Sequence, residues 1–102
     1  MIIELCRLTQ DVEIKTISTK DGKEIAVLNN RIAITHNKNI TSFIDITAWG
    51  ELAKFIGKYF SKGDELFIEG SIRNKDYPVG EKTIQMPYIL VESVKFTYGN
   101  KK

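Results

Sequence analysis

Polar and apolar residues alternate along most of the chain, which is the pattern of strands that bury one face. The clearest case runs from Thr41 to Trp49, where Ile44, Ile46 and Ala48 fall on one side. Similar runs predict four further strands, at Ile2 to Ile17, Glu24 to Thr35, Glu65 to Arg73 and Thr83 to Tyr98.

Interruptions of this alternation predict bends and turns. The first segment should bend near Gln10, and the Asp-Gly pair within residues 20–22 predicts a tight turn before the second strand. Asn30 interrupts the apolar face of that second strand, and a bulge that shifts the register is one explanation. Polar loops are expected at residues 36–40 and 73–82.

One segment has helical spacing instead. In GELAKFIGKYF the apolar residues recur at i, i+3, i+4, i+7 and i+8, so they form one helical stripe. We expect Gly50 to start the helix and Gly63 to stop it. The stripe consists of Leu52, Phe55, Ile56, Tyr59 and Phe60.

The predicted order is therefore strand, strand, strand, helix, strand, strand. This is the order of the five-stranded Greek-key barrel known as the OB-fold, an all-β architecture whose second and third strands bind oligonucleotides or oligosaccharides. A mixed α+β sandwich is the alternative. We expect one domain over residues 1–98 and a short tail over residues 99–102.

Composition narrows the class without deciding the function. The 102 residues are 42% hydrophobic and 27% charged, which excludes a mostly disordered chain. The net charge of +2 is too small to indicate a nucleic-acid binder by itself, so a binder must concentrate its cations on one face. Cys6 is expected to be a small buried thiol. With no signal-like or membrane-spanning segment at the N-terminus, we expect a cytoplasmic protein with no membrane partner.

Catalytic chemistry has little support in the sequence. The one histidine, His36, lies in a polar segment without a second histidine or a cysteine nearby, whereas a metal site needs three or four converging ligands. There is no glycine-rich phosphate loop. We therefore expect no enzyme activity, no metal and no cofactor.

Two exposed aromatics carry the functional prediction. Phe43 and Trp49 lie six residues apart on one predicted strand, so both point to the face that also holds Asp45 and Thr47. Burial in the core does not explain large aromatics on that polar face. Stacking of unpaired bases does, although packing against a subunit or a folded loop is the alternative.

Cations accompany a third aromatic in the polar segment 73–82. Tyr77 lies among Arg73, Lys75 and Lys82, a mixture suited to phosphate contact and base stacking, although a solvated loop would look the same. Arg31 should point outward from the second strand, and Arg7 interrupts the first. Either arginine could contact phosphate or pair with a carboxylate such as Asp45.

These segments resemble those of bacterial single-stranded-DNA-binding proteins. CRLTQDVEIK resembles the pattern G-R-L-T-x-D-P-E-L-R, and EIAVLNNRIAIT resembles the second strand of that family. FIDITAWGELAKFIGKYFSKGDELFIEGSIRNKDY matches the third strand, helix, fourth strand and loop almost position for position, and YILVESVKF resembles the closing strand. The resemblance covers nearly the whole chain.

The resemblance implies an OB-fold, sequence-tolerant binding of single-stranded DNA, and a homo-oligomer, usually a homotetramer although a dimer is an option. It implies base stacking at Phe43, Trp49 and Tyr77. Cationic residues near the path of the strand would be Arg7, Arg31, Arg73 and Lys75.

Departures from the family pattern bear on the bend, the affinity and the partners. Cys6 replaces a glycine and Val12 a proline, so the bend in the first strand can differ. HNKNI stands where the family often carries another aromatic, so we expect one stacking surface fewer and a lower affinity. No acidic tail that recruits replication and repair enzymes follows GNKK, so we expect either a short form or a shortened chain.

The sequence therefore predicts a non-enzymatic protein that coats single-stranded DNA during replication, recombination or repair. Two other functions use the same barrel. One is a primosome-type accessory protein that mainly binds other replication proteins, and the other is an RNA-binding module.

Overall fold

The chain folds as the predicted succession of elements, with the long first segment divided in two. The computed structural model describes residues 2–97, with all side chains except those of residues 2, 3, 36 and 37. Within this range the helix α1 (Gly50–Tyr59) follows the fourth of six strands. The strands are β1 (Ile2–Leu8), β2 (Ile14–Ser18), β3 (Glu24–Asn37), β4 (Ile40–Trp49), β5 (Glu65–Val79) and β6 (Lys82–Lys95). The tail expected at residues 99–102 lies outside the described residues.

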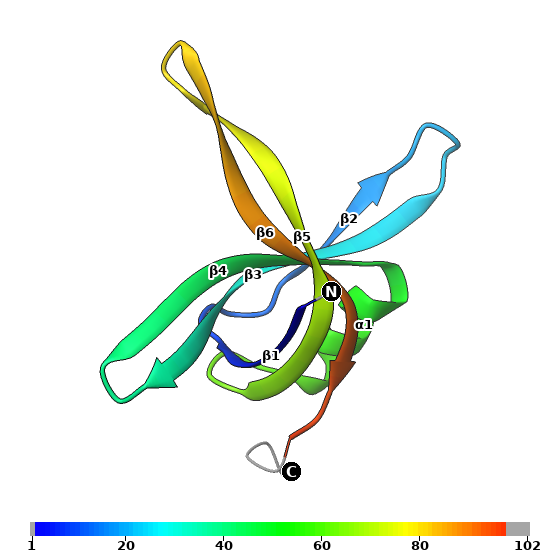
Figure 1. Ribbon diagram of the computed structural model, residues 1–102. Coiled ribbons are helices and arrows are strands. Elements are labelled where there is room, and N and C mark those ends of the chain that lie inside the picture. Colours follow the sequence, from blue (N-terminus) through cyan, green and yellow to red (C-terminus); the bar gives the residue numbers. More distant parts are fainter. Residues whose placement is uncertain (1, 98–102) are drawn as a thin grey trace.

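The strands close into a barrel. Their order is β1-β5-β6-β4-β3-β2, and an additional pairing of β1 with β3 closes the first five of these into a ring, with β2 attached to β3. All neighbours are antiparallel except β4 and β6, which run parallel. This closed ring with one helix between β4 and β5 is an OB-fold, as predicted. Three hairpins extend beyond the ring as arms, formed by β2 with β3, β3 with β4, and β5 with β6 (Figure 1).

The alternating apolar residues fill the barrel. Leu28 and Ile32 of β3 and Ile46 of β4 are fully buried, as the alternation predicts. Helix α1 covers the barrel with Ala53 and Ile56, both fully buried; Ile56 belongs to the predicted apolar stripe, whereas Ala53 lies outside it. Each of the buried leucines and isoleucines contributes about 1.5–3 kcal/mol through its removal from water.

Cys6 belongs to this core, as predicted. It is buried, and its thiol lies 3.7 Å from the carbonyl oxygen of Leu66. Burial, with smaller contributions from the negative charges of Glu4 and Glu65, raises the pKa of Cys6 to about 12. The thiol is therefore protonated at neutral pH and behaves as a small apolar residue.

Asn30 marks the place where β3 changes partner. Residues 24–28 of β3 pair with β2, whereas Ile32 and Ala33 of the same strand pair with β1. Asn30 is buried in the gap, where its Nδ2 donates to the carbonyl oxygen of Gln10 at 3.1 Å and its Oδ1 accepts from the amide of Arg31 at 2.7 Å. The bulge considered at this position is therefore wrong, because the pairing of β3 with β4 continues through Asn30 without a shift.

A register shift interrupts the pairing of β5 with β6, and the extra residue, Glu92, lies on β6. The pairing of β5 with β6 shifts between Glu69 and Gly70. A side chain at Gly70 would collide with the carbonyl oxygen of Leu90, so only glycine allows the two strands to approach this closely. Beyond this point β5 leaves the barrel, which is why Ile72 is 52% exposed although it continues the apolar alternation.

Both expected polar loops are paired strands instead. Strand β5 runs on to Val79 and β6 starts at Lys82, with a turn at Gly80, whose φ of 63° favours glycine. Strand β3 similarly runs to Asn37, and β4 begins at Ile40. These hairpins have two solvated faces, so their residues do not show the apolar alternation by which a half-buried strand is recognised.

The helix begins where predicted and ends earlier. Gly50 is its first residue and has a φ of 63°. Tyr59 is its last residue, and the extended Phe60 donates its amide to the carbonyl oxygen of Ile56. Gly63, with a φ of 87°, lies in the following turn, so its assignment as the helix stop was wrong.

The hydrogen bonds of Asn30 predict a large stability effect. Replacement Asn30→Ala removes both bonds and leaves the carbonyl of Gln10 without this partner, so the free energy of unfolding should fall by about 1–3 kcal/mol. Urea denaturation measures the change. The control Asn74→Ala, at an exposed residue of β5, should stay within about 0.5 kcal/mol of the parent. Equal effects of the two substitutions would contradict the stabilising role of the Asn30 hydrogen bonds.

Candidate nucleic-acid interface

Phe43 and Trp49 lie on the outer face of β4, as the alternation predicts. Their exposed fractions are 55% and 46%, so about half of each residue is open to solvent. Six residues of extended strand separate them by about 20 Å along β4. The two aromatics therefore offer separate flat surfaces to a ligand that follows the strand.

Thr47, between these aromatics, is buried rather than solvated. Its hydroxyl donates to Oδ1 of Asn29 at 2.7 Å and accepts from Nζ of Lys75 at 3.1 Å. The same ammonium group lies 3.5 Å from Oδ1 of Asn29. Lys75 therefore crosses from β5 over β3 and β4 and divides the outer face between Phe43 and Trp49.

The β5–β6 arm separates its side chains by type. From residue 70 onward the register places Arg73 opposite Tyr88, Lys75 opposite Met86, and Tyr77 opposite Ile84, all on one face. Val79 and Lys82 pair on that face at the tip. All four arm residues predicted from the sequence thus share one face. The other face holds Asn74, Asp76, Pro78, Thr83, Gln85 and Pro87.

Tyr88 is a residue of this face that sequence reasoning missed. Nζ of Lys75 lies 4.5 Å from the centre of the Tyr88 ring, a cation–π contact. Tyr88 lies at even spacing from Met86 and Ile84, so the three share one face of a strand. The sequence would have placed Tyr88 on this face if residues 73–82 had been treated as part of a hairpin. Because the segment was expected to be a loop, no register linked Tyr88 to Lys75.

A groove runs along the root of this arm over β3 and β4. Its central cleft of about 430 Å³ is bordered by Lys75 and Tyr77 on one side and by Asn29 and Arg31 on the other. A second hollow of about 440 Å³ shares Gln10 and Asn29 with the cleft. A third, of about 130 Å³, shares Arg31 and Asp45 with it. Phe43, Ile44, Met86 and Pro87 complete that third hollow.

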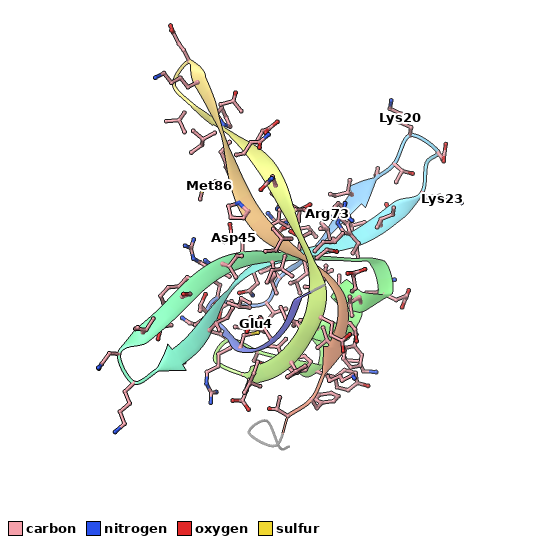
Figure 2. The ribbon with its side chains drawn as sticks, in the orientation of Figure 1. Glu4, Lys20, Lys23, Asp45, Arg73 and Met86 are labelled. Atoms are coloured by element: carbon pink, nitrogen blue, oxygen red, sulfur yellow. The ribbon has the colours of Figure 1, made fainter. Side chains whose placement is uncertain are left out.

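The floor of the groove contains an ion pair. Nη1 of Arg31 lies 3.6 Å from Oδ1 of Asp45, and the two side chains are 50% and 39% exposed. Of the two alternatives for Arg31, the carboxylate pairing is thus the one observed. Such an exposed pair contributes only about 0–1 kcal/mol, so a ligand can compete for either member. Asp45 lies at the root of the β5–β6 arm (Figure 2).

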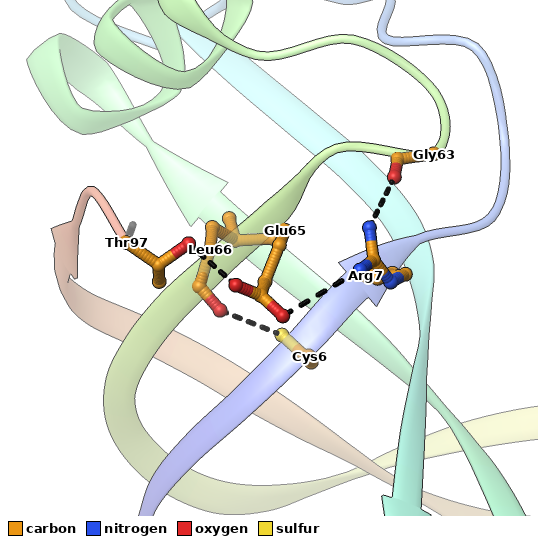
Figure 3. A network of polar contacts seen from close by, with 6 residues as sticks. All are labelled: Cys6, Arg7, Gly63, Glu65, Leu66 and Thr97. Carbon is orange, nitrogen blue, oxygen red and sulfur yellow. Dashed lines mark hydrogen bonds and ion pairs between the residues drawn. The ribbon is translucent and has the colours of Figure 1, made fainter. Parts of the chain in front are cut away.

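Arg7 does not line the central cleft or the hollow beside Phe43, although the register places it in one row with Ala33 and Phe43. Its Nη1 donates to the carbonyl oxygen of Gly63 at 3.0 Å, and Nη2 lies 3.6 Å from Oε2 of Glu65 (Figure 3). The other oxygen of Glu65 accepts from the hydroxyl of Thr97 at 2.7 Å. These contacts join β1 to β5 and to the end of the described chain, so Arg7 has a local structural role.

Trp49 lies beside the β2–β3 arm. The register aligns Trp49 with Val27 and Val27 with Lys15, so these residues share the outer face across three strands. Lys20 and Lys23 lie at the tip of the same arm (Figure 2). The three lysines were not singled out from the sequence, because the alignment of Lys15 with Trp49 and the place of Lys20 and Lys23 on the same arm depend on strand pairing.

Two further observations concern metal binding and membrane-spanning helices. Among the side chains that the structure describes, which do not include His36, no group of three or more His, Cys, Asp or Glu is arranged to hold a metal ion. Within residues 2–97, α1 is too short and too polar to span a bilayer.

Comparison with known proteins identifies the kind of chain that carries this groove. Residues 1–97 match the family described as the single-strand binding protein family. The chain is 35% identical over 94 residues to a protein of Malacoplasma penetrans named single-stranded DNA-binding protein, covering 87% of this chain and 47% of that one. A protein of the same name from Fusobacterium nucleatum is 31% identical over 94 residues, with 88% and 61% coverage. The chain thus spans about half to three fifths of these two relatives.

The contacts of Lys75 predict how the arm is held. In Lys75→Met the Thr47 hydroxyl and the Tyr88 ring lose the ammonium group, so the β5–β6 arm should open more often. We expect hydrogen exchange of the arm amides to accelerate about two- to tenfold, equivalent to about 0.5–1.5 kcal/mol. Exchange followed by mass spectrometry measures this. Lys82→Met, at the tip of the arm, is the control, and equal acceleration in both variants would contradict the anchoring role.

Proposed function

The chain belongs to the single-strand binding protein family, and on that premise we propose that it binds single-stranded DNA along the groove over β3 and β4. The observation that carries the proposal is the outer face of β4, where Phe43 and Trp49 are exposed beside the cationic face of the β5–β6 arm. The proposed role is non-catalytic protection of unpaired strands during replication, recombination or repair.

Base stacking supplies the sequence-tolerant part of the binding. Every base has a π-face, and stacking on an aromatic side chain contributes about 1–3 kcal/mol per base. We assign this role to Phe43, Trp49 and Tyr77, which is 39% exposed and borders the central cleft. In a duplex the bases are stacked on each other, so these rings cannot reach their faces. The arrangement therefore favours single strands.

Phosphate contacts supply the salt-dependent part of the proposed DNA binding. Arg31 and Lys75 border the cleft, whereas Arg73 and Lys82 extend the cationic face along the arm. Neutralising phosphates releases condensed counterions, so affinity falls as salt increases. Arg7 would contribute only if its contacts with Gly63 and Glu65 were exchanged for phosphate.

We also propose that the protein acts as a homo-oligomer, as a homotetramer or a dimer. The support is the open side of β1, which within the described chain pairs with β3 only at Arg7 and Leu8, and the 49% exposure of Leu5. Several linked grooves on one strand raise the overall affinity beyond that of each groove.

The intrinsic fluorescence of Trp49 tests the proposal directly, because the chain has one tryptophan. Titration with oligo-dT should quench the emission, a duplex of equal length should change it little, and the affinity should fall as salt is added. An RNA oligomer of equal length shows whether the sugar matters. Absence of quenching together with capture of a replication protein would support the accessory-protein function instead.

Substitution of single aromatics tests the stacking assignment. Phe43→Ala and Trp49→Ala should each weaken oligo-dT binding by about 1–3 kcal/mol, with little change in stability because both rings are exposed. Isothermal titration calorimetry measures the affinity of both variants. Tyr59→Ala is the matched control, because Tyr59 is 43% exposed but lies on α1. A loss of affinity in the control as large as in the two variants would refute the assignment.

A further inference from the structure

The floor of the proposed DNA groove contains a negative charge. Asp45 borders both the central cleft and the hollow beside Phe43, and its side chain is 39% exposed. A carboxylate repels the phosphates that the surrounding cations attract. Its exposed ion pair with Arg31 adds little to stability, so the fold does not require this charge.

Asp45 and Arg31 lie next to a stacking surface. The register pairs Ala33 with Phe43 and Arg31 with Asp45, and these two rows are adjacent on the same outer face. Ala33 is small, so it leaves the side of the Phe43 ring toward β3 open. A base lying on Phe43 would therefore present its edge to the Arg31–Asp45 pair.

The pair combines an acceptor with a donor. A carboxylate only accepts hydrogen bonds, and a guanidinium only donates them. The Watson–Crick edge of cytosine carries an amino donor at one end and two acceptors, N3 and O2, beside it. Uracil and thymine instead place their single N–H donor between two carbonyl oxygens, where a carboxylate meets repulsion on both sides.

We propose that Asp45, together with Arg31, reads the exocyclic amino group of the base stacked on Phe43, so that this subsite prefers cytosine to uracil or thymine. Asp45 accepts from the 4-amino group, as acidic side chains do when they contact cytosine. Arg31 donates to N3 and O2, so at this subsite it contacts the base and leaves the phosphate to Lys75. This inference rests on the proposed function and adds a local base preference to it.

Competition binding tests the preference. Oligo-dC and oligo-dU of equal length, which differ in the groups of the base edge and not in a methyl group, displace a fluorescent oligo-dT from the protein. The solution is kept mildly alkaline so that cytosine stays unprotonated. The parent protein should bind oligo-dC about three- to tenfold more tightly than oligo-dU.

Substitution of Asp45 assigns the effect. In Asp45→Asn the amide can donate or accept, so the preference should fall to less than about twofold. Asp76→Asn is the matched control, because it removes the same charge from the other face of the β5–β6 arm and should keep the parent preference. Replacing the cytosines by pyrimidin-2-one, which lacks only the 4-amino group, should abolish the preference in the parent protein without altering its fold.

The outcomes are distinguishable. Loss of preference in Asp45→Asn alone, matched by the pyrimidin-2-one oligomer, supports the inference. Equal binding of oligo-dC and oligo-dU by the parent, an unchanged preference in Asp45→Asn, or an equal loss in Asp76→Asn overturns it while DNA binding stands. Failure to bind any of the oligomers overturns the proposed function, and this inference with it.

Discussion

Closure of the barrel depends on the hydrogen bonds made where β3 changes partner. Asn30 holds the carbonyl of Gln10, and the carbonyl of Arg31 accepts from both the amide and the hydroxyl of Thr9. These bonds fix the connection between β1 and β2 against the middle of β3. The same backbone positions set the outward direction of the Arg31 side chain, so closure of the core and geometry of the groove are linked at one place.

A second linkage joins the β5–β6 arm to the barrel. Lys75 contacts both Thr47 and Tyr88. The contact with Thr47 helps to bury a hydroxyl that alternation alone would leave in water. The ammonium group satisfies the threonine hydroxyl and also holds a positive charge between the two exposed rings of β4. A cation placed there can meet the backbone of a strand whose bases lie on Phe43 and Trp49.

The sequence predicted the elements that bury one face and missed those that do not. The alternation of β4 predicted the exposed side for Phe43 and Trp49, and the order of elements predicted the OB-fold. The arm of β5 and β6 has two solvated faces, so its residues were expected to form a loop. Tyr88 and the burial of Thr47 depend on contacts between segments distant in sequence. The position of Lys15 beside Trp49 likewise follows from the strand register, which no single segment encodes, whereas alternation within β4 already placed Asp45 on the face of the aromatics.

The modest net charge of +2 becomes consistent with a polyanionic ligand once the charges are located. Arg7 and Lys95 are paired with carboxylates of β5, and Lys54 is paired within α1, all outside the groove. The cations of the arm share one face, and the carboxylate of Asp76 is on the other. Cations therefore gather on one face of the arm although the chain is nearly neutral, while Asp11 and Glu13 line the neighbouring hollow together with Lys15. Asp45 is the carboxylate that lines the central cleft itself, beside Arg31. Because an unnecessary anion there would weaken every phosphate contact nearby, its position is best explained by a contact with the bases themselves.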